Sequence, residues 1–160
     1  MIMMQMLTFR RGATLCMVAL GCVLGCGQPQ PQLVRVEGAV TLDGEPLRAG
    51  TVVMVSEDDP KLGEARSLVD DKGRFTMVHD AFPRGVGVPV GRYRLAVVAF
   101  RGQSGDVGAP TLMVPAESVD PQTSGLVLDV TAGSAGEEVT IALKTSGGPG
   151  SVLPRTADAP

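Results

Sequence analysis

The sequence predicts an all-β domain, a small two-sheet sandwich of about seven strands, preceded by an N-terminal leader. Apolar and polar residues alternate in short segments about ten residues apart, which is the pattern of half-buried strands joined by turns. The 160 residues include 21 Gly and 12 Pro, counts typical of such a chain. No segment after Cys26 keeps a helical period. Because aromatic residues make up only 3% of the chain, we expect a core of Val, Leu, Ile and Ala.

Residues 1–25 are predicted to be a signal peptide that is removed. Arg10 and Arg11 form its positive end, and residues 12–25 are uncharged and largely apolar. As a helix this apolar run would be roughly 21 Å long, shorter than the ~30 Å hydrocarbon core of a bilayer. The length favours a cleaved signal over the alternative, a permanent anchor helix.

The end of the leader resembles the lipobox of bacterial lipoprotein signals. Residues 23–26 read Val-Leu-Gly-Cys, an aliphatic residue, a tolerant position, a small residue and a cysteine. The resemblance implies that the Cys26 thiol takes up a diacylglyceryl group, and acyl chains such as palmitate would then hold the protein at a membrane. Cys22 is a competitor with a shorter apolar run before it, and a buried cysteine beside an ordinary cleavage site is the other alternative. Residues 26–32 comprise this cysteine and a Pro/Gln tether.

Charge and cysteine content argue against a nucleic-acid partner and against an intramolecular disulfide. The formal net charge is −3, and removal of Arg10 and Arg11 from the 14 basic residues leaves 12 against 17 acidic ones. An acidic body without basic runs argues against nucleic acid as a partner. Cys16 and Cys22 belong to the removed segment, so the mature chain would have no intramolecular disulfide.

The body, residues 33–144, contains the predicted strands. Val34, Val36, Val40 and Leu42 alternate with polar residues, and a turn at residues 43–46 follows them. The other six predicted strands cover residues 51–56, 65–69, 74–78, 91–100, 126–130 and 139–143.

Three further features of the body guide the fold prediction. Residues 70–73, Asp-Asp-Lys-Gly, are a compact hairpin signal between two predicted strands. The longest predicted strand, residues 91–100, places Tyr93 on an apolar face. Residues 145–160 contain mostly Gly, Ser, Pro and Ala, with little to bury, so we predict a disordered tail.

Four motifs together resemble carboxypeptidase regulatory-like domains. Three of them are the opening strand and turn at residues 36–47, the turn at 70–75 and the strand start at 91–95, Gly-Arg-Tyr-Arg-Leu, and the fourth is residues 114–126. Residues 114–126 are similar to a pattern of small planctomycete-type lipoproteins that carry this domain. Covering residues 34–143, the resemblance implies a transthyretin-like or prealbumin-like sandwich with Tyr93 inside. It also implies an accessory or binding module, although a fold by itself does not establish function.

Enzymatic activity is not expected, and no cofactor or metal is predicted. Hydroxyisourate hydrolases and intradiol dioxygenases, which share related folds, need several His or Tyr residues, whereas this chain has one of each. His79 and Asp80 could suggest a base with its orienting carboxylate, but adjacent residues of an extended segment point to opposite faces. We therefore expect His79 to be a solvated loop residue. Ser124 has no second histidine to activate it and is predicted to form a turn.

Two acidic clusters could bind Ca²⁺ if their loops met at one end of the sandwich. They comprise residues 57–59, Glu-Asp-Asp, and residues 70–71, Asp-Asp. The alternative is that these loops are acidic because they are exposed to water. The sequence favours the second interpretation, since neither cluster has the ligand order of a dedicated calcium loop.

The candidate partner contact is the long segment between the strands ending near Phe100 and starting at Leu126. Residues 101–108 are glycine-rich and predicted to be mobile, whereas Leu112, Met113 and Val114 are consecutive apolar residues. These three form either a short edge strand or an edge that binds a partner.

The function predicted from these features is that of a membrane-anchored lipoprotein outside the cytoplasm. Its sandwich would be a non-enzymatic binding or envelope-structural module in the periplasm or on the cell surface. Its partners would be the membrane, through the lipid on Cys26, and an envelope protein or a polysaccharide. The alternative is an accessory domain, binding carbohydrate or protein, that serves a separate enzyme.

Overall fold

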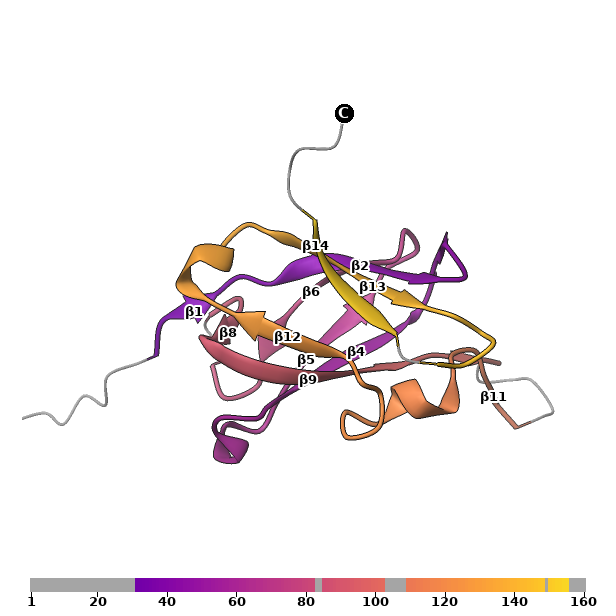
Figure 1. Cartoon of the computed structure of the whole chain (residues 1–160), viewed down its shortest axis with the longest axis horizontal. Coiled ribbons are helices and arrows are strands. Elements are labelled where there is room, and N and C mark those ends of the chain that lie inside the picture. Colours follow the sequence, from indigo (N-terminus) through magenta and orange to yellow (C-terminus); the bar gives the residue numbers. More distant parts are fainter. Residues whose placement is uncertain (1–30, 83–84, 103–108, 149, 156–160) are drawn as a thin grey trace, which may run out of the picture.

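A computed structural model describes residues 31–82, 85–102, 109–148 and 150–155. The predicted signal peptide and Cys26 lie outside the described residues. The all-β prediction is confirmed: among the described residues the only helices are single 3₁₀ turns, η1 (Pro60–Leu62), η2 (Ala116–Val119) and η3 (Ala132–Ser134). Two main sheets pack face to face as a sandwich (Figure 1).

The first sheet is antiparallel throughout and has the strand order β12-β9-β4-β5-β7. Its strands are β4 (Gly50–Ser56), β5 (Glu64–Val69), β7 (Val78–His79), β9 (Gly91–Val98) and β12 (Val127–Val130). Burial alternates along β4, where Val52 and Met54 are buried while Val53 and Val55 are only partly covered. This sheet therefore has one buried face and one face toward solvent.

The second sheet has the order β14-β13-β2-β3, and β6 also pairs with β2. Its strands are β2 (Glu37–Leu42), β3 (Glu45–Pro46), β6 (Arg74–Thr76), β13 (Glu138–Leu143) and β14 (Ser151–Arg155). The ladder between β2 and β13 is parallel, whereas the other ladders of this sheet are antiparallel. Two short ladders join β1 (Leu33–Val34) to β8 (Val88–Pro89) and β10 (Phe100–Arg101) to β11 (Thr111–Leu112).

All seven predicted segments contain strands, but those predicted at 34–42, 74–78 and 91–100 are each divided in two, and the predicted hairpin at residues 70–73 differs from the structure. Its turn is formed, because the Asp70 amide donates to the Arg74 carbonyl at 2.9 Å and the Asp70 carboxylate accepts from the Lys72 and Arg74 amides. However, β5 and β6 belong to different sheets. β6 pairs with β2, which places Phe75 in the core, and the chain then returns to the first sheet as β7.

The prediction of a disordered tail is wrong for residues 151–155. These residues form β14, which pairs antiparallel with β13 over Ser151 to Arg155. Val152 packs against the core, and the open edge of β13 supplies the hydrogen-bond partners that a short, proline-containing segment lacks by itself. Residues 156–160 lie outside the described part of the chain.

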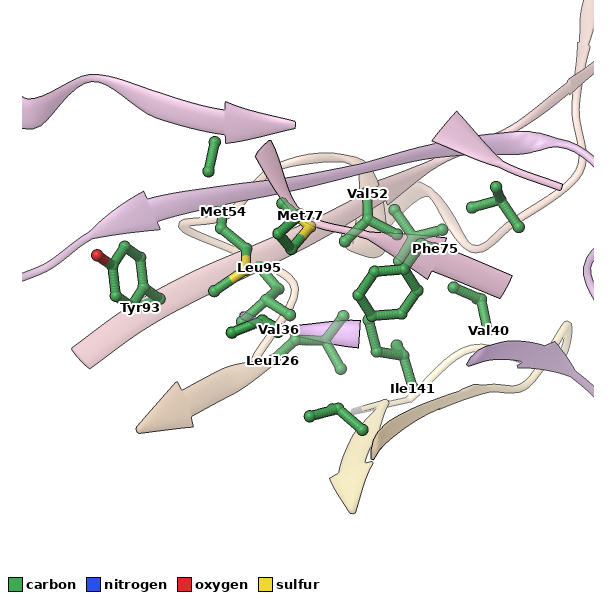
Figure 2. Packing of buried hydrophobic residues seen from close by; sticks show 14 of the residues in the cluster. Val36, Val40, Val52, Met54, Phe75, Met77, Tyr93, Leu95, Leu126 and Ile141 are labelled. Atoms are coloured by element: carbon green, nitrogen blue, oxygen red, sulfur yellow. The ribbon is translucent and has the colours of Figure 1, made fainter. Parts of the chain in front are cut away.

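The core fills the space between the two sheets with aliphatic side chains and few aromatic ones (Figure 2). Tyr93 is 1% exposed, as the resemblance implies, and its hydroxyl donates a hydrogen bond of 2.8 Å to the Pro89 carbonyl. Burial raises the pKa of Tyr93 to about 12. The phenol therefore stays neutral and acts as a buried anchor between β9 and the segment before it.

The parallel pair of β2 and β13 approaches closely at Gly38. A Cβ atom at this position would lie 2.0 Å from the Val139 carbonyl oxygen and 2.9 Å from Cζ of Phe75. The absence of a side chain thus lets β2, β6 and β13 come together, because backbone atoms of β13 cannot move away as a flexible side chain could.

Candidate functional site

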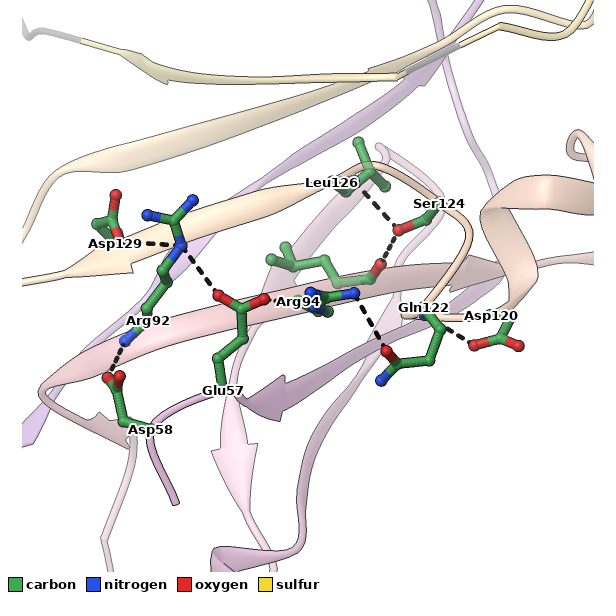
Figure 3. A network of polar contacts seen from close by, with 10 residues as sticks. Glu57, Asp58, Arg92, Arg94, Asp120, Gln122, Ser124, Leu126 and Asp129 are labelled. Carbon is green, nitrogen blue, oxygen red and sulfur yellow. Dashed lines mark hydrogen bonds and ion pairs between the residues drawn. The ribbon is translucent and has the colours of Figure 1, made fainter. Parts of the chain in front are cut away.

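A network of charged side chains links three elements of the first sheet (Figure 3). Glu57, in the loop after β4, forms ion pairs with Arg92 and Arg94 of β9; the Arg92 Nε to Glu57 Oε2 distance is 2.9 Å. Arg92 Nε also lies 3.9 Å from the Asp129 carboxylate on β12. These side chains are a quarter to two thirds exposed, so each pair stabilises the fold by at most about 1 kcal/mol.

The same network continues into the loops at both ends. The Asp58 carboxylate accepts a hydrogen bond of 2.7 Å from the Arg92 amide, and Arg94 Nη1 donates to the Gln122 side chain at 3.1 Å. The backbone amide of Gln122 in turn donates a hydrogen bond to the Asp120 carboxylate. The network therefore positions the loop after β4 and the crossover before β12, and its cations already have anionic or amide partners.

The two acidic clusters lie at opposite ends of the sandwich. The loop with Glu57, Asp58 and Asp59 joins β4 to β5, whereas Asp70 and Asp71 follow the far end of β5. Asp59 also accepts from the Lys61 amide. Among the described residues, no group of three or more His, Cys, Asp or Glu is arranged to hold a metal ion. The condition for a shared calcium site, that these loops meet, is contradicted.

His79 is buried, so the prediction of a solvated loop histidine is wrong. It lies in β7 at 0% exposure, with its ring 5.1 Å from that of Phe82. Nδ1 accepts from the Ala81 amide at 3.2 Å, and Nε2 has no hydrogen-bond partner. Desolvation lowers the pKa of His79, although nearby Asp80 opposes the shift. Because neither ring nitrogen bonds to Asp80, the arrangement does not form a base with an orienting carboxylate.

Ser124 has a structural role at the end of the crossover. Its hydroxyl donates to the Leu95 carbonyl at 2.5 Å and accepts from the Leu126 amide at 3.1 Å. The side chain is 2% exposed. Ser124 thus joins the start of the β12 segment to the edge of β9, and its hydroxyl is occupied as both donor and acceptor.

The structure places Leu112, Met113 and Val114 against the core. Leu112 lies in β11 and pairs with Phe100, which matches the predicted short edge strand. Met113 donates its amide to the Ala99 carbonyl at 2.9 Å, and both Leu112 and Met113 are partly buried. Val114 is only 5% exposed and belongs to the core, so its side chain is not accessible to a partner. Residues 103–108, predicted to be mobile, lie outside the described residues.

A cleft that the sequence did not reveal opens between the two sheets at one side. It has a volume of about 280 Å³ and lies between the edge strands β12 and β14. Its lining is mainly apolar and also includes the polar residues Asp129, Ser134 and Glu137. The lining residues are Val36, Val127, Leu128, Asp129, Val130, Ser134, Glu137, Val139, Val152 and Pro154. Alternation within residues 126–130 predicted the strand that forms one wall but not the cleft, because the opposite wall comes from residues 151–155, for which a disordered tail is predicted.

Fold and site together define a small all-β sandwich with an apolar cleft at its side. Comparison of the chain with protein-family models, with curated proteins and with solved structures gave no match. Within the described residues, no helix combines the length and the apolar character needed to cross a bilayer.

Proposed function

We propose that this protein is an exported lipoprotein whose sandwich is a non-enzymatic binding or envelope-structural module. The observation that carries the proposal is the order of three segments. The lipobox-like residues 23–26 end in Cys26, the polar residues 27–32 follow, and the first strand of the sandwich starts at Leu33. A lipid on Cys26 would hold this folded domain close to a membrane surface, outside the cytoplasm.

The polar groups of the domain support a binding or structural role over catalysis. The side chains with the greatest catalytic potential, His79 and Ser124, are both buried within the fold. Arg92 and Arg94 are paired with Glu57. A sandwich with Tyr93 in its core also supports the resemblance of residues 34–143 to carboxypeptidase regulatory-like domains, which serve as accessory or binding modules.

Metabolic labelling with an alkynyl palmitate analogue tests the anchor. The wild-type chain and the Cys22→Ala variant should both incorporate the label and partition into detergent. Cys26→Ala should not incorporate the label, because its side chain has no thiol to modify, and it should be released from membranes or stay in them as an uncleaved precursor. Labelling of Cys26→Ala at the wild-type level, or loss of labelling in Cys22→Ala alone, would contradict the assignment of the lipid to Cys26.

A further inference from the structure

The edges of the two main sheets differ in their capacity to accept another strand. Among the described strands, β3 and β14 contain Pro46 and Pro154, and a proline removes a backbone donor from an edge. β6, next to β3, uses its Thr76 amide to bind Ser67 Oγ, and β7 is bridged by Gly87. β12 has four residues without proline and, within the described part of the chain, pairs with β9 alone.

The cleft lies directly beside this open edge. Val127, Leu128 and Val130 of β12 form one wall, and Val152 of β14 forms the other. A strand added along β12 would direct alternate side chains toward the second sheet, because side chains along a strand alternate between its faces. An apolar side chain from such a strand can enter the cleft and remove its apolar lining from water.

Charge restricts which strand the edge accepts. Asp129 lies within β12 with its side chain 67% exposed, and Arg92, its cationic neighbour, is nearer to Glu57. Glu137 lines the same cleft. Like charges placed directly opposite each other across a ladder are destabilising, whereas opposite charges attract. An acidic segment is therefore disfavoured at this edge, and so is a second β12, because its own Asp129 would add negative charge there. A basic segment is favoured.

We propose that the β12 edge binds an extended segment of a partner protein in which apolar and basic residues alternate. The segment adds a strand to the first sheet, places an apolar side chain in the cleft and, on the opposite face, a Lys or Arg beside Asp129. Main-chain hydrogen bonds supply affinity, and the cleft and Asp129 supply specificity. This inference rests on the proposed function only in taking the sandwich to be a binding module.

Titration of the full chain with short synthetic peptides tests the proposal. The probe is a peptide in which valine alternates with lysine, and its controls carry glutamate in place of lysine or N-methylated amides along one edge. The lysine peptide should bind, slow the hydrogen exchange of the outward amides within Val127–Val130, and shift the NMR signals of the cleft valines. The glutamate and N-methylated peptides should bind about tenfold more weakly or not at all.

A charge-reversed variant tests the specificity. Asp129→Lys should lose about tenfold in affinity for the lysine peptide and gain affinity for the glutamate peptide. Asp71→Lys makes the same change at an exposed turn and should bind as the wild type does. Thermal unfolding of Asp129→Lys checks that the variant is folded, and Asp129→Asn, with an intermediate affinity, serves in its place if it is not.

Three results would overturn the proposal. These are equal binding of the lysine and glutamate peptides, unchanged binding by Asp129→Lys, and protection of β12 by concentration-dependent dimers without peptide. The last would make a second copy the occupant. Peptide binding by Cys26→Ala is measured separately from its labelling. Failure of the lipid anchor would change only the labelling result, whereas failure of this edge site would change only the peptide-binding result.

Discussion

The carboxylate of Asp43 accepts hydrogen bonds from both the amide and the hydroxyl of Thr145, a residue 102 positions further along the chain. The amide nitrogen lies 3.0 Å from Asp43 Oδ1. Asp43 occupies the left-handed region, with φ of 53°, in the turn between β2 and β3. The pair therefore attaches the first turn of the second sheet to the end of β13, close to where the Asp43 amide meets the Leu143 carbonyl.

Replacement of Asp43 by alanine should lower the thermal midpoint at pH 7. The hydrogen bonds from Thr145 hold the pKa of Asp43 below its usual value of 3.8, so the folded state favours the ionised carboxylate. This contribution is present above pH 3.8 and disappears as the pH falls through the lower, folded-state pKa. Melting curves should show a larger difference between wild type and Asp43→Ala at pH 7 than at pH 2, where only the cost of alanine in the left-handed region remains. Asp71→Ala is the control; an equal loss of stability at both pH values would contradict the role of the charge.

Acidification should destabilise the protein through His79. Burial lowers the pKa of His79 in the folded state below its usual value of 6.5. Between the folded-state and unfolded-state pKa values, the unfolded chain therefore binds more protons than the folded one. The free energy of unfolding consequently falls as the pH drops below 6.5. His79→Leu removes this proton uptake. Urea unfolding at pH 7 and pH 5 should therefore show a smaller pH effect in the variant. His79 is the single histidine of the chain, so His79→Leu removes all histidine titration. An identical pH effect in both proteins would therefore mean that His79 is not the group responsible.

Tyr93 should contribute through both its ring and its hydroxyl. Tyr93→Ala removes a side chain that is 1% exposed and should lower the free energy of unfolding by about 3 kcal/mol. Tyr93→Phe keeps the ring but leaves the Pro89 carbonyl without its donor, which should lower it by about 1–2 kcal/mol. Chemical denaturation measures both values. A loss below about half a kcal/mol in Tyr93→Ala would place the ring outside the core.

A chain that ends after Gly148, which keeps the contacts of Thr145 with Asp43 and of Gly148 with Glu117, should be less stable than one that ends after Arg155. The shorter chain lacks β14, so the outer edge of β13 loses its ladder and Val152 no longer covers the core. The loss should be about 2 kcal/mol, the scale for burial of an aliphatic side chain, and urea unfolding measures it. The chain ending at Arg155 is the matched control because it retains the complete strand. Equal midpoints would show that β14 does not stabilise the sheet.

Sequence periodicity predicted the strands well because alternation reports which side of a strand is buried. It placed Tyr93 on the apolar face of its strand, the resemblance implied that Tyr93 packs inside, and the structure agrees. Alternation does not report which strand is the neighbour, so the move of β6 into the second sheet could not be read from the turn at residues 70–73. His79 was mistaken for an exposed residue because its strand has only two residues, too few to show a period.

The cleft and β14 escaped prediction for a related reason. Val152 and Leu153 stand between glycine, serine and proline residues, and as an isolated segment they have too little apolar surface to order themselves. They form a strand because β13 provides hydrogen-bond partners from a distant part of the chain. The cleft depends on both β12 and β14, so it too is a property of tertiary structure.

The parallel ladder that joins Glu37–Leu42 to Glu138–Leu143 also has a kinetic consequence. Contacts between residues so far apart require closure of a long loop before any hydrogen bond compensates for the lost chain entropy, which places such sandwiches among the slow folders, at about milliseconds to seconds. A chain emerging from its N-terminus cannot assemble the second sheet until β13 is available. Until then β2 lacks its longest ladder and has only β3 and β6 to pair with.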